Sequence, residues 1–563
     1  MSGTVVTRPK GWRLFVAALR TRKSASMLAL GFSSGLPFAL LVGTLTAWLG
    51  EVGIKMATIG VLSWIGLTYA FKFLWSPLVD RLQLPVLGKL GRRKSWIVLC
   101  QGLMIVALVG LVVTDPVQNI GIFALFAFLG SLGSATQDVA IDGWRIDVAD
   151  EDAPVELLSA VNQLGYRAAS IVGGAIALYM AARMSWPTVY LVMAGVMAAM
   201  LVIALIAPDT QRTPSEAVLA LADSGEIDPR TRAIALAVVG VSWIWAIGSL
   251  IGFMVSMLAD TPPGVPKPSP GDFLKYHGPA IVFATVLVPL GVAAILNWLK
   301  VQGRHVQAER DTQVSPVRTA ANHLYGALVA PLADLVARLG WGVLIVIGLI
   351  LTYALCYNVW ASFAYPFYLE FMHYSKDEVA FASKIFGIIM SIIGVSLGGY
   401  LFAKIGRFPT VLIGAILPIF GNFIYADLAD GSPHIDPVMH LLRLDSLAVA
   451  FGSDERMARL LLAISYENIS TGLALAAFVA FLSGIVSKKF AAVQYAVLSS
   501  LTFLIGSLGK GMAGEMIDKY GYADVFRYVA AVGVLAIVFV LLEWWRASQV
   551  PTVVEAGNTG KPA

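Results

Sequence analysis

The sequence predicts an all-α polytopic membrane protein, with two six-helix bundles and an inserted two-helix hairpin, fourteen spans in total. Of its 563 residues, 58% are apolar and 13% are charged, and the mean hydropathy is +0.77. Soluble domains contain about 25% charged residues. Apolar runs of about 20 residues recur along the chain, and each is long enough to cross a hydrocarbon core of about 30 Å. These observations predict the fold class.

The distribution of positive charge orients the predicted spans. Most of the 40 Lys and Arg residues lie in loops on the side of the N-terminus. The positive-inside rule assigns that side to the cytoplasm, so we expect both termini there. Because this basic excess is confined to short loops, it does not indicate nucleic-acid binding. Cys100 and Cys356 lie inside predicted spans and form neither a disulfide framework nor a metal-binding pattern.

The first half of the chain is predicted to form one bundle, residues 26–208. Residues 1–25 precede it as a basic amphipathic stretch that we expect to lie along the cytoplasmic leaflet. Pro37 is expected to bend the first span, and we favour a bent helix that lines a cavity over a harmless kink. The six spans are expected at about 26–50, 58–79, 95–114, 119–146, 155–182 and 185–207.

The loop after the second span contains charges at both ends. Asp80 and Arg81 end that span, and Arg92 and Arg93 follow Gly91 at the start of the next. Ordinary positive-inside residues would explain the basic cluster but not the acidic residue, which can pair at a neighbouring helix end. The pattern resembles the loop signature of the major facilitator superfamily, lengthened here by residues 82–90.

Residues 209–340 are predicted to be a linker that contains the extra hairpin, at about 233–258 and 280–299. These two apolar runs contain almost no ionisable residues, unlike the fourth span. We therefore expect the hairpin to pack outside the bundles and away from the transport pathway. An amphipathic stretch is expected to follow at about 320–338.

The second half, residues 341–546, is expected to repeat the first in parallel. An additional periplasmic helix is expected at 437–450, and residues 547–563 are expected to form a disordered tail. Trp48, Tyr365 and Tyr368 are interpreted as aromatic residues of the membrane interface. The six spans are expected at about 341–371, 379–403, 408–427, 459–486, 491–515 and 523–545.

Charged residues inside the spans indicate the site, because a charge near the bilayer centre costs at least about 2.5 kcal/mol. At about 100° per residue, Asp138, Asp142 and Arg145 share one face of the fourth span. Gln163 and Arg167 lie one turn apart on the fifth span. Burial disfavours a charged carboxylate and a nearby Arg favours it, which predicts proton coupling by Asp138, Asp142 and Arg167. A buried ion pair that only joins two helices is the alternative.

Other intramembrane polar residues are predicted to bind substrate or to form gates. The aromatic residues of the seventh span either stack on sugar rings or belong to ordinary packing, and Glu467 and Lys510 either pair when an outer gate shuts or bind substrate separately. Lys72 either binds an anion or snorkels. The predicted substrate-binding residues are Lys72, Gln137, Gln163, Tyr353, Tyr357, Asn358, Trp360, Glu467, Asn468 and Lys510. The predicted gate residues are Asp80, Arg81, Arg92, Arg93, Arg145 and Asp147.

The sequence does not predict an enzyme. It contains no Walker loop, no nucleotide-binding fingerprint and no nucleophile–base pair in a recognisable context. All six His residues lie in predicted loops or at their rims, and we expect neither a metal nor another cofactor. A secondary transporter driven by an ion gradient is therefore the predicted class.

Five sequence blocks together suggest a family. They are Gly31-Phe-Ser-Ser-Gly-Leu-Pro37, Phe71-Lys-Phe-Leu-Trp-Ser-Pro77, Gln137-Asp-Val-Ala-Ile-Asp142-Gly-Trp, Leu164-Gly-Tyr-Arg167 and Glu467-Asn468. In both halves the chain resembles the bacterial AmpG muropeptide permeases of the major facilitator superfamily, which are related to acetyl-coenzyme A transporters. The resemblance implies a proton symporter of the bacterial inner membrane. It would import GlcNAc-1,6-anhydroMurNAc and its peptides for peptidoglycan recycling and β-lactamase induction.

The partners expected from this resemblance are the anhydromuropeptide substrate, protons and the lipid bilayer, and the protein is expected to be a monomer. Two alternatives stay open. The block at 137–144 also occurs in acetyl-coenzyme A transporters, so the substrate could be another bulky anion. A transporter-like sensor would instead bind a ligand without moving it.

Overall fold

The structure is a computed structural model, and in the residues that it describes the regular elements are helices. The described residues are 21–76, 79, 82–150, 153, 155–208, 227–259, 266–304, 322, 324–326, 328–443, 446, 454–487 and 491–549. Thirteen of the described helices are long and apolar enough to cross a membrane, and Met56–Tyr69 is a shorter apolar helix. Together they correspond to the fourteen predicted spans. Asp80, Arg81, the N-terminal stretch 1–20 and residues 550–563 lie outside the described residues.

Two spans of the first half are interrupted by a π-helical turn, at Ala39–Thr44 and at Val172–Ile176. α2 (Arg22–Phe38) includes Pro37 and continues through a π-helical turn, Ala39–Thr44, into α3 (Leu45–Glu51). A proline removes one helical hydrogen bond, which explains the change of helical geometry after it. The other elements of this half are α4 (Met56–Leu62), α5 (Leu67–Phe71), α7 (Arg92–Val113), α8 (Ile120–Val148), α9 (Val155–Ile171), α10 (Ala177–Ala181) and α11 (Trp186–Ile206).

The hairpin and the second half follow the predicted order. The hairpin consists of α13 (Pro229–Leu258) and of α14 (Pro270–Val282) with α15 (Val288–Val301), and α17 (Ala330–Leu339) is the amphipathic helix after it. The remaining elements are α18 (Gly342–Thr352), α19 (Leu355–Asn358), α20 (Ala364–Pro366), α21 (Lys376–Val379), α22 (Gly387–Ile405), α23 (Arg407–Ala429), α24 (Ile435–Leu441), α26 (Glu455–Ile485), α27 (Ala491–Tyr520) and α28 (Tyr522–Gln549).

Side-chain caps fix where several of these helices begin. The carboxylate of Asp228 accepts hydrogen bonds from the backbone of Arg230 and Thr231 at the start of α13. Ser269 caps α14 and Asp454 caps α26 in the same way. Such caps satisfy backbone N–H groups that a helix cannot satisfy internally. The sequence therefore defines these helix starts locally.

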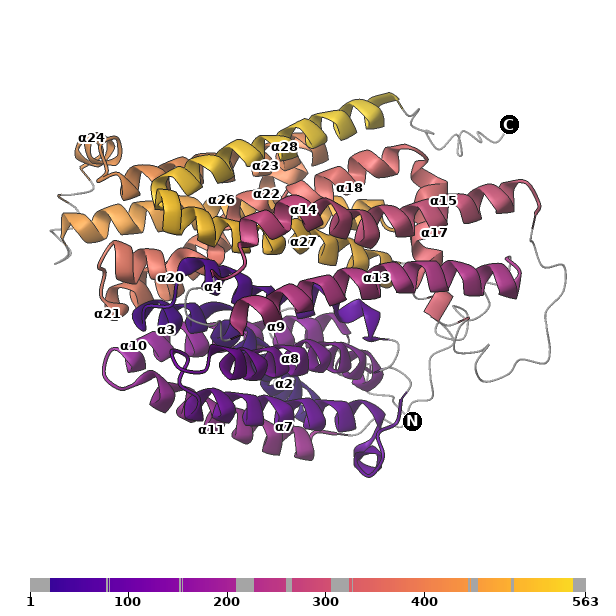
Figure 1. Cartoon of the computed structure of the whole chain (residues 1–563), viewed down its shortest axis with the longest axis horizontal. Coiled ribbons are helices and arrows are strands. Elements are labelled where there is room, and N and C mark those ends of the chain that lie inside the picture. The colour runs from indigo at the N-terminus through magenta and orange to yellow at the C-terminus, as the bar shows by residue number, and fades with distance from the viewer. Residues whose placement is uncertain are drawn as a thin grey trace, which may run out of the picture.

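The two halves pack their helices alike. In the first half α7 packs against α8 and α11, and in the second half α23 packs against α26 and α28. These are the third, fourth and sixth spans of each half. Figure 1 shows the two halves as separate layers, with the first half below and the second above. This equivalence is what a parallel repeat requires.

The halves meet along a seam where α4 packs against α27, and where the π-helical turn Val172–Ile176 packs against the π-helical segment Ala380–Phe386. Glycines permit the first contact. A Cβ atom on Gly60 would lie 2.4 Å from the carbonyl oxygen of Lys510, and one on Gly514 would lie 2.2 Å from that of Met56. Small residues at these positions allow the helix backbones to approach closely.

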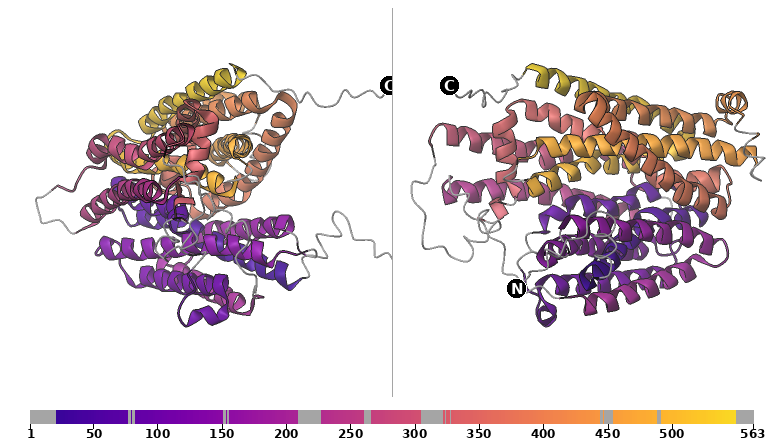
Figure 2. Two further views of the ribbon diagram at one scale, coloured as in Figure 1. Left: turned by 90° about the vertical axis from the view of Figure 1, so that its right-hand side faces the viewer. Right: turned by 180° about the vertical axis from the view of Figure 1, so that it is seen from behind.

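The hairpin covers one side of this seam, as Figures 1 and 2 show. α13 packs against α4 and α8 of the first half, and α14 packs against α27 of the second. At the outer end, meaning the end where α3, α10, α21 and α24 lie, Glu515 of α27 accepts hydrogen bonds from Ser269 and Gly271 at 2.7 Å. The hairpin thus contacts both halves.

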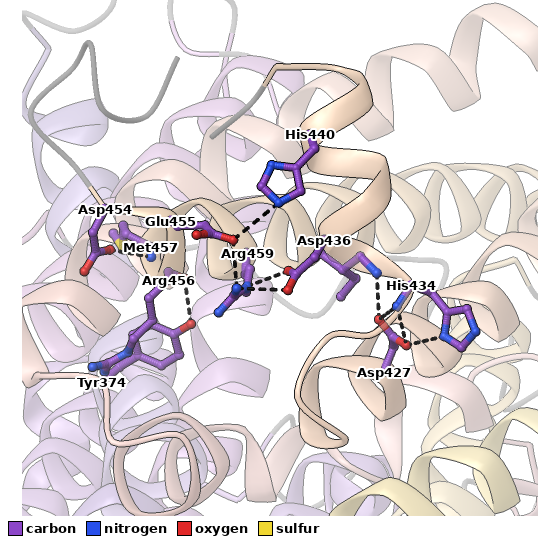
Figure 3. A network of polar contacts seen from close by, with 11 residues as sticks. Tyr374, Asp427, His434, Asp436, His440, Asp454, Glu455, Arg456, Met457 and Arg459 are labelled. Carbon is purple, nitrogen blue, oxygen red and sulfur yellow. Dashed lines mark hydrogen bonds and ion pairs between the residues drawn. The ribbon is translucent and has the colours of Figure 1, made fainter. Parts of the chain in front are cut away.

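A polar network at the outer end attaches α24 to α26 (Figure 3). The guanidinium of Arg459 lies 2.7 and 3.0 Å from the carboxylate oxygens of Asp436 and 2.8 Å from Glu455. His434, just before α24, contacts Asp427 of α23 at 2.6 Å. An additional helix therefore exists in this connection. It lies at Ile435–Leu441, and most of the predicted range after 443 is outside the described residues.

Candidate functional site

Asp138 and Lys72 form an ion pair inside the first half. The Nζ atom of Lys72 lies 3.5 Å from the carboxylate of Asp138, whose side chain is only 16% exposed. Ser34 donates a second hydrogen bond to this carboxylate at 2.5 Å. The three side chains come from α8, from the turn Lys72–Leu74 after α5, and from α2. The buried charge of Asp138 is thus balanced by groups from two other spans.

The neighbouring glutamines leave hydrogen-bonding atoms without partners. Gln101 and Gln137 both donate from their side-chain amides to the hydroxyl of Ser33 at 3.1 Å. Their amide oxygens are buried and have no hydrogen-bond partner within the described residues. Buried polar atoms normally have a partner. Their clustering beside Asp138 therefore favours a place for water or a polar ligand.

Three of the predicted gate residues lie together nearer the inner end, where α7 begins and α8 ends. The carboxylate of Asp147 lies 3.3 Å from the guanidinium of Arg93 and 3.9 Å from that of Arg92. Asp142 pairs with Arg145 within α8 at 3.0 Å, and its side chain is 52% exposed. These contacts stay within one half, so they join helix ends and do not connect the two halves.

Arg167 and Gln163 are exposed on α9 and do not pair with Asp138. Arg167 shares a helical face with Gly174, which is two turns away. A Cβ atom on Gly174 would lie 2.8 Å from the side chain of Lys384, in the second half. This face of the fifth span is therefore oriented toward the second half. The proposed coupling role of Arg167 stays a prediction.

The second half contains its own buried carboxylate, Glu467 of α26. Tyr425 donates its hydroxyl hydrogen bond to Glu467 at 2.6 Å, and the hydroxyl of Tyr368 lies 2.7 Å from that of Tyr425. Tyr368 is 2% exposed, and Trp48 and Tyr365 are 3% and 5% exposed. The interpretation of these three aromatic residues as a membrane-interface belt is therefore wrong, because protein side chains cover them.

The aromatic residues of the seventh span divide into two groups. Tyr353 stacks on Phe478 with ring centroids 4.5 Å apart and donates to the carbonyl of Val411. Trp360 packs 4.5 Å from the ring of Tyr425. In this conformation Tyr353 and Trp360 therefore belong to the ordinary packing of the bundle, and neither ring is free to stack on a sugar. Tyr357 and Asn358 are half-buried, and the amide nitrogen of Asn358 is buried without a partner in the described residues, so a substrate contact by these two stays a prediction.

Glu467 and Lys510 are not paired with each other here. Glu467 is held by Tyr425, whereas Lys510 is 5% exposed and has no ion pair within the described part of the chain. Asn468 donates to the carbonyl of Ile464 within its own helix at 3.0 Å. Although contacts between the halves close the outer end here, Glu467 and Lys510 do not form the pair that was predicted for a shut outer gate.

Charged contacts between the halves close the outer end. Lys376 lies 2.7 Å from Glu51 and donates to the carbonyl of Ala181 at 2.9 Å. Arg183 forms a bidentate pair with Asp377 at 2.8 Å, and these hydrogen bonds raise the pKa of the guanidinium. The carboxylate of Asp518, in α27, accepts hydrogen bonds from the backbone of α4. Each of these contacts joins the two halves at the outer end.

Sequence reasoning missed several of these residues. The sequence predicts no role for Ser34, Lys384 or Tyr425. Lys384 could have been recognised, because a lysine near the start of an apolar span is unusual. The sequence also gives no prediction for the contacts of Glu51, Arg183, Lys376 and Asp377 between the halves. Among the described residues no group of three or more His, Cys, Asp or Glu side chains could hold a metal ion.

Comparison with known proteins identifies the fold. The family model of the Major Facilitator Superfamily matches residues 27–258. The crystal structure of an auto-inhibited POT family peptide transporter superposes with a TM-score of 0.58 at 12% identity, covering 96% of this chain and 99% of that one. The POT family transporter PepTSo gives a TM-score of 0.55 at 13% identity, with 96% and 100% coverage. The predicted fold class, that of the major facilitator superfamily, is confirmed.

Relatives by sequence extend over nearly the whole chain. The anhydromuropeptide permease of Escherichia coli K12 is 26% identical over 525 residues, which are 92% of this chain and 79% of the permease. The putative transporter AmpG 4 of Rickettsia felis is 25% identical over 516 residues, which are 91% of this chain and 94% of that protein. The resemblance to the AmpG permeases is thus confirmed, and relatives of this kind are transporters by name.

Proposed function

We propose that this chain, a membrane protein with the major facilitator fold whose relatives across nine-tenths of its length include anhydromuropeptide permeases, is itself an anhydromuropeptide transporter. The substrate is GlcNAc-1,6-anhydroMurNAc and its peptide derivatives. Transport runs from the periplasm to the cytoplasm across the bacterial inner membrane, with protons moving in the same direction. Both termini are cytoplasmic, and the working unit is a monomer.

The pairing of Lys72 with Asp138 carries the mechanistic part of this proposal. A charged side chain inside a membrane is costly and generally has a function. Replacing a buried ion pair by apolar residues is often neutral or stabilising. An ion pair that only joined helices would therefore add little to the stability of the fold, because burying its two charges costs free energy. Three helices meet at this pair, and the residue next to Asp138 in the chain, Gln137, has a buried amide oxygen without a partner among the described residues.

The pair supports a simple exchange mechanism. Lys72 binds either the carboxylate of Asp138 or an anionic group of the substrate. When a proton from the periplasm neutralises Asp138, Lys72 is released and accepts the substrate anion. When the proton leaves toward the cytoplasm, Asp138 regains its charge, pairs with Lys72 again and displaces the substrate. The closed outer end and the intact pair at 3.5 Å are consistent with the state after release.

Uptake of the anhydro-disaccharide into proteoliposomes tests the function. We expect accumulation when the exterior is acidic and little accumulation without the pH gradient. Asp138→Asn should abolish accumulation against a gradient while binding and substrate exchange persist. Accumulation that ignores the pH gradient would contradict proton coupling. Uptake of acetyl-coenzyme A in its place would contradict the substrate assignment, and binding without any flux would indicate a sensor.

A further inference from the structure

We infer that Lys384 is a second substrate contact, which binds a carboxylate group of the substrate from the second half of the transporter. This inference rests on the proposed function and specifies the chemistry of one of its subsites. Lys384 lies in the π-helical segment Ala380–Phe386 of the eighth span. Eight residues separate it from Lys376 at the outer gate, which places it about 12 Å along the helix from that end.

Lys384 is a half-buried cation, and no carboxylate of the described residues lies within ion-pair distance of it. In the described part of the chain it has neither an ion pair nor a hydrogen bond. Its ammonium group instead makes a cation–π contact: the Nζ atom lies 5.2 Å from the ring centroid of Tyr365. A cation–π contact orients an ammonium group but replaces only part of its hydration. An unpaired charge at this depth is costly unless a cavity or a ligand compensates for it.

The carboxylate of Glu467 is close enough to Lys384 for the two charges to interact electrostatically, but it does not pair with Lys384 directly. However, the two side chains do not come within the 4 Å of an ion pair, and Glu467 instead accepts the hydrogen bond of Tyr425 at 2.6 Å. All three ammonium hydrogens of Lys384 therefore stay available to an acceptor from outside the protein.

Lys384 and Tyr365 both lie at the seam between the halves. A Cβ atom on Gly174 of the first half would lie 2.8 Å from the side chain of Lys384, and one on Gly43 would lie 3.9 Å from the ring of Tyr365. Tyr365 is 5% exposed, and its hydroxyl is buried without a hydrogen-bond partner in the described residues. An ammonium group thus lies over the ring of a tyrosine whose hydroxyl is unused, at the place where a carrier holds its substrate between two halves.

The comparison with Lys72 explains why the ligand is a carboxylate from the substrate. Each half has a lysine on its second span and a buried carboxylate on its fourth, namely Lys72 with Asp138 and Lys384 with Glu467. In the first half the two side chains are paired at 3.5 Å, whereas in the second half the carboxylate is held by a tyrosine. While Asp138 is charged, it occupies Lys72. Of the two lysines, only Lys384 can then bind an anion of the substrate.

Uptake of two matched substrates tests this inference in the full-length protein in proteoliposomes. One is the peptide-bearing anhydromuropeptide with free carboxylates, and the other is the same compound with its carboxylates converted to methyl esters. We expect native protein to prefer the free acid by about tenfold or more in kcat/KM, the scale of one charge-assisted hydrogen bond. Lys384→Gln should reduce that preference severalfold by slowing only the free acid, with Lys72 maintaining the remainder, and Lys384→Arg should keep most of it.

Lys404→Gln is the matched control. Lys404 lies on the same span and also contacts an aromatic ring, that of Tyr400 at 5.4 Å, but it is exposed at the other end of the helix. It should leave both rates unchanged. An equal loss for both substrates in Lys384→Gln, or an unchanged preference, would overturn the inference while leaving the proposed function intact. Native protein that takes up neither substrate would overturn both.

Discussion

The ammonium group of Lys376 in the second half lies 2.7 Å from the carboxylate of Glu51 in the first. Beside it, Arg183 and Asp377 join the same two halves with their side chains 46% exposed. Solvent-exposed ion pairs contribute only about 0–1 kcal/mol each. Such weak contacts suit a gate, because a transporter must break and reform them in every cycle.

Removing one of these pairs should shift the protein toward an outward-open state. We expect Asp377→Asn to increase labelling of a cysteine placed at Thr46 by an impermeant maleimide added outside. Thr46 is 5% exposed while the gate is closed, and Cys100 and Cys356 are buried. The loss of about 1 kcal/mol corresponds to a rise of roughly fivefold.

The control for this experiment is Lys519→Gln, which removes an exposed pair within α27 that does not connect the halves. It should leave labelling at Thr46 unchanged. Equal labelling in Asp377→Asn and in the parent protein would show that this pair does not hold the gate closed.

The ion pair of Lys72 with Asp138 should behave asymmetrically in stability. Lys72→Met leaves a buried carboxylate without its cation, and breaking a buried pair in this way costs about 3–5 kcal/mol. The double variant Lys72→Met with Asp138→Asn removes both charges and should recover most of that stability, but not proton-driven uptake. Thermal unfolding midpoints of the purified variants measure the first effect, and proteoliposome uptake measures the second. A double variant no more stable than Lys72→Met would argue against direct coupling of the two residues.

Glycine at position 60 should be required for contact between the halves. A Cβ atom there would lie 2.4 Å from the carbonyl oxygen of Lys510, so Gly60→Ala must push α4 and α27 apart. Overpacking of this kind costs about 1–3 kcal/mol. We expect a lower unfolding midpoint and slower uptake. Gly195→Ala, on α11 where a Cβ atom meets nothing within 4 Å, is the matched control and should be neutral.

Attachment of α17 at the inner end should weaken in acid. Burial raises the pKa of Asp334, but hydrogen bonds from Gln494 and Arg338 outweigh this effect, so the pKa is lowered overall. A lowered pKa in the folded state means that the stabilisation is present at neutral pH and is lost as the pH falls through that pKa. Because Asp334 is partly exposed, the effect is small.

Hydrogen exchange of α17 measured between pH 7 and pH 3, corrected for the intrinsic rate, tests this prediction. Protection should fall at the acidic end in the native protein and should vary less in Asp334→Asn. The same fall in both proteins would assign the acid sensitivity to another group.

Much of the fold follows from the sequence because hydrophobicity and helix caps are local properties. The run from Arg92 to Val113 is apolar enough to span a membrane wherever it lies, and Asp228 caps α13 with its own neighbours. Asp138 and Glu467 were also recognisable locally, as charges within apolar runs. The number and order of the spans and the two buried carboxylates therefore required no tertiary information.

Partner choice is different because it depends on the rotation and depth of helices that are distant in sequence. Asp138 pairs with Lys72, 66 residues away, rather than with Arg145 or Arg167. For the same reason, Tyr368 looked like an interface residue although other side chains bury it. Only the packing of the two halves places Lys384 beside Tyr365 at the seam and Lys376 against Glu51. The sequence by itself determined which charges lie in the membrane, and the tertiary structure decided which of them meet.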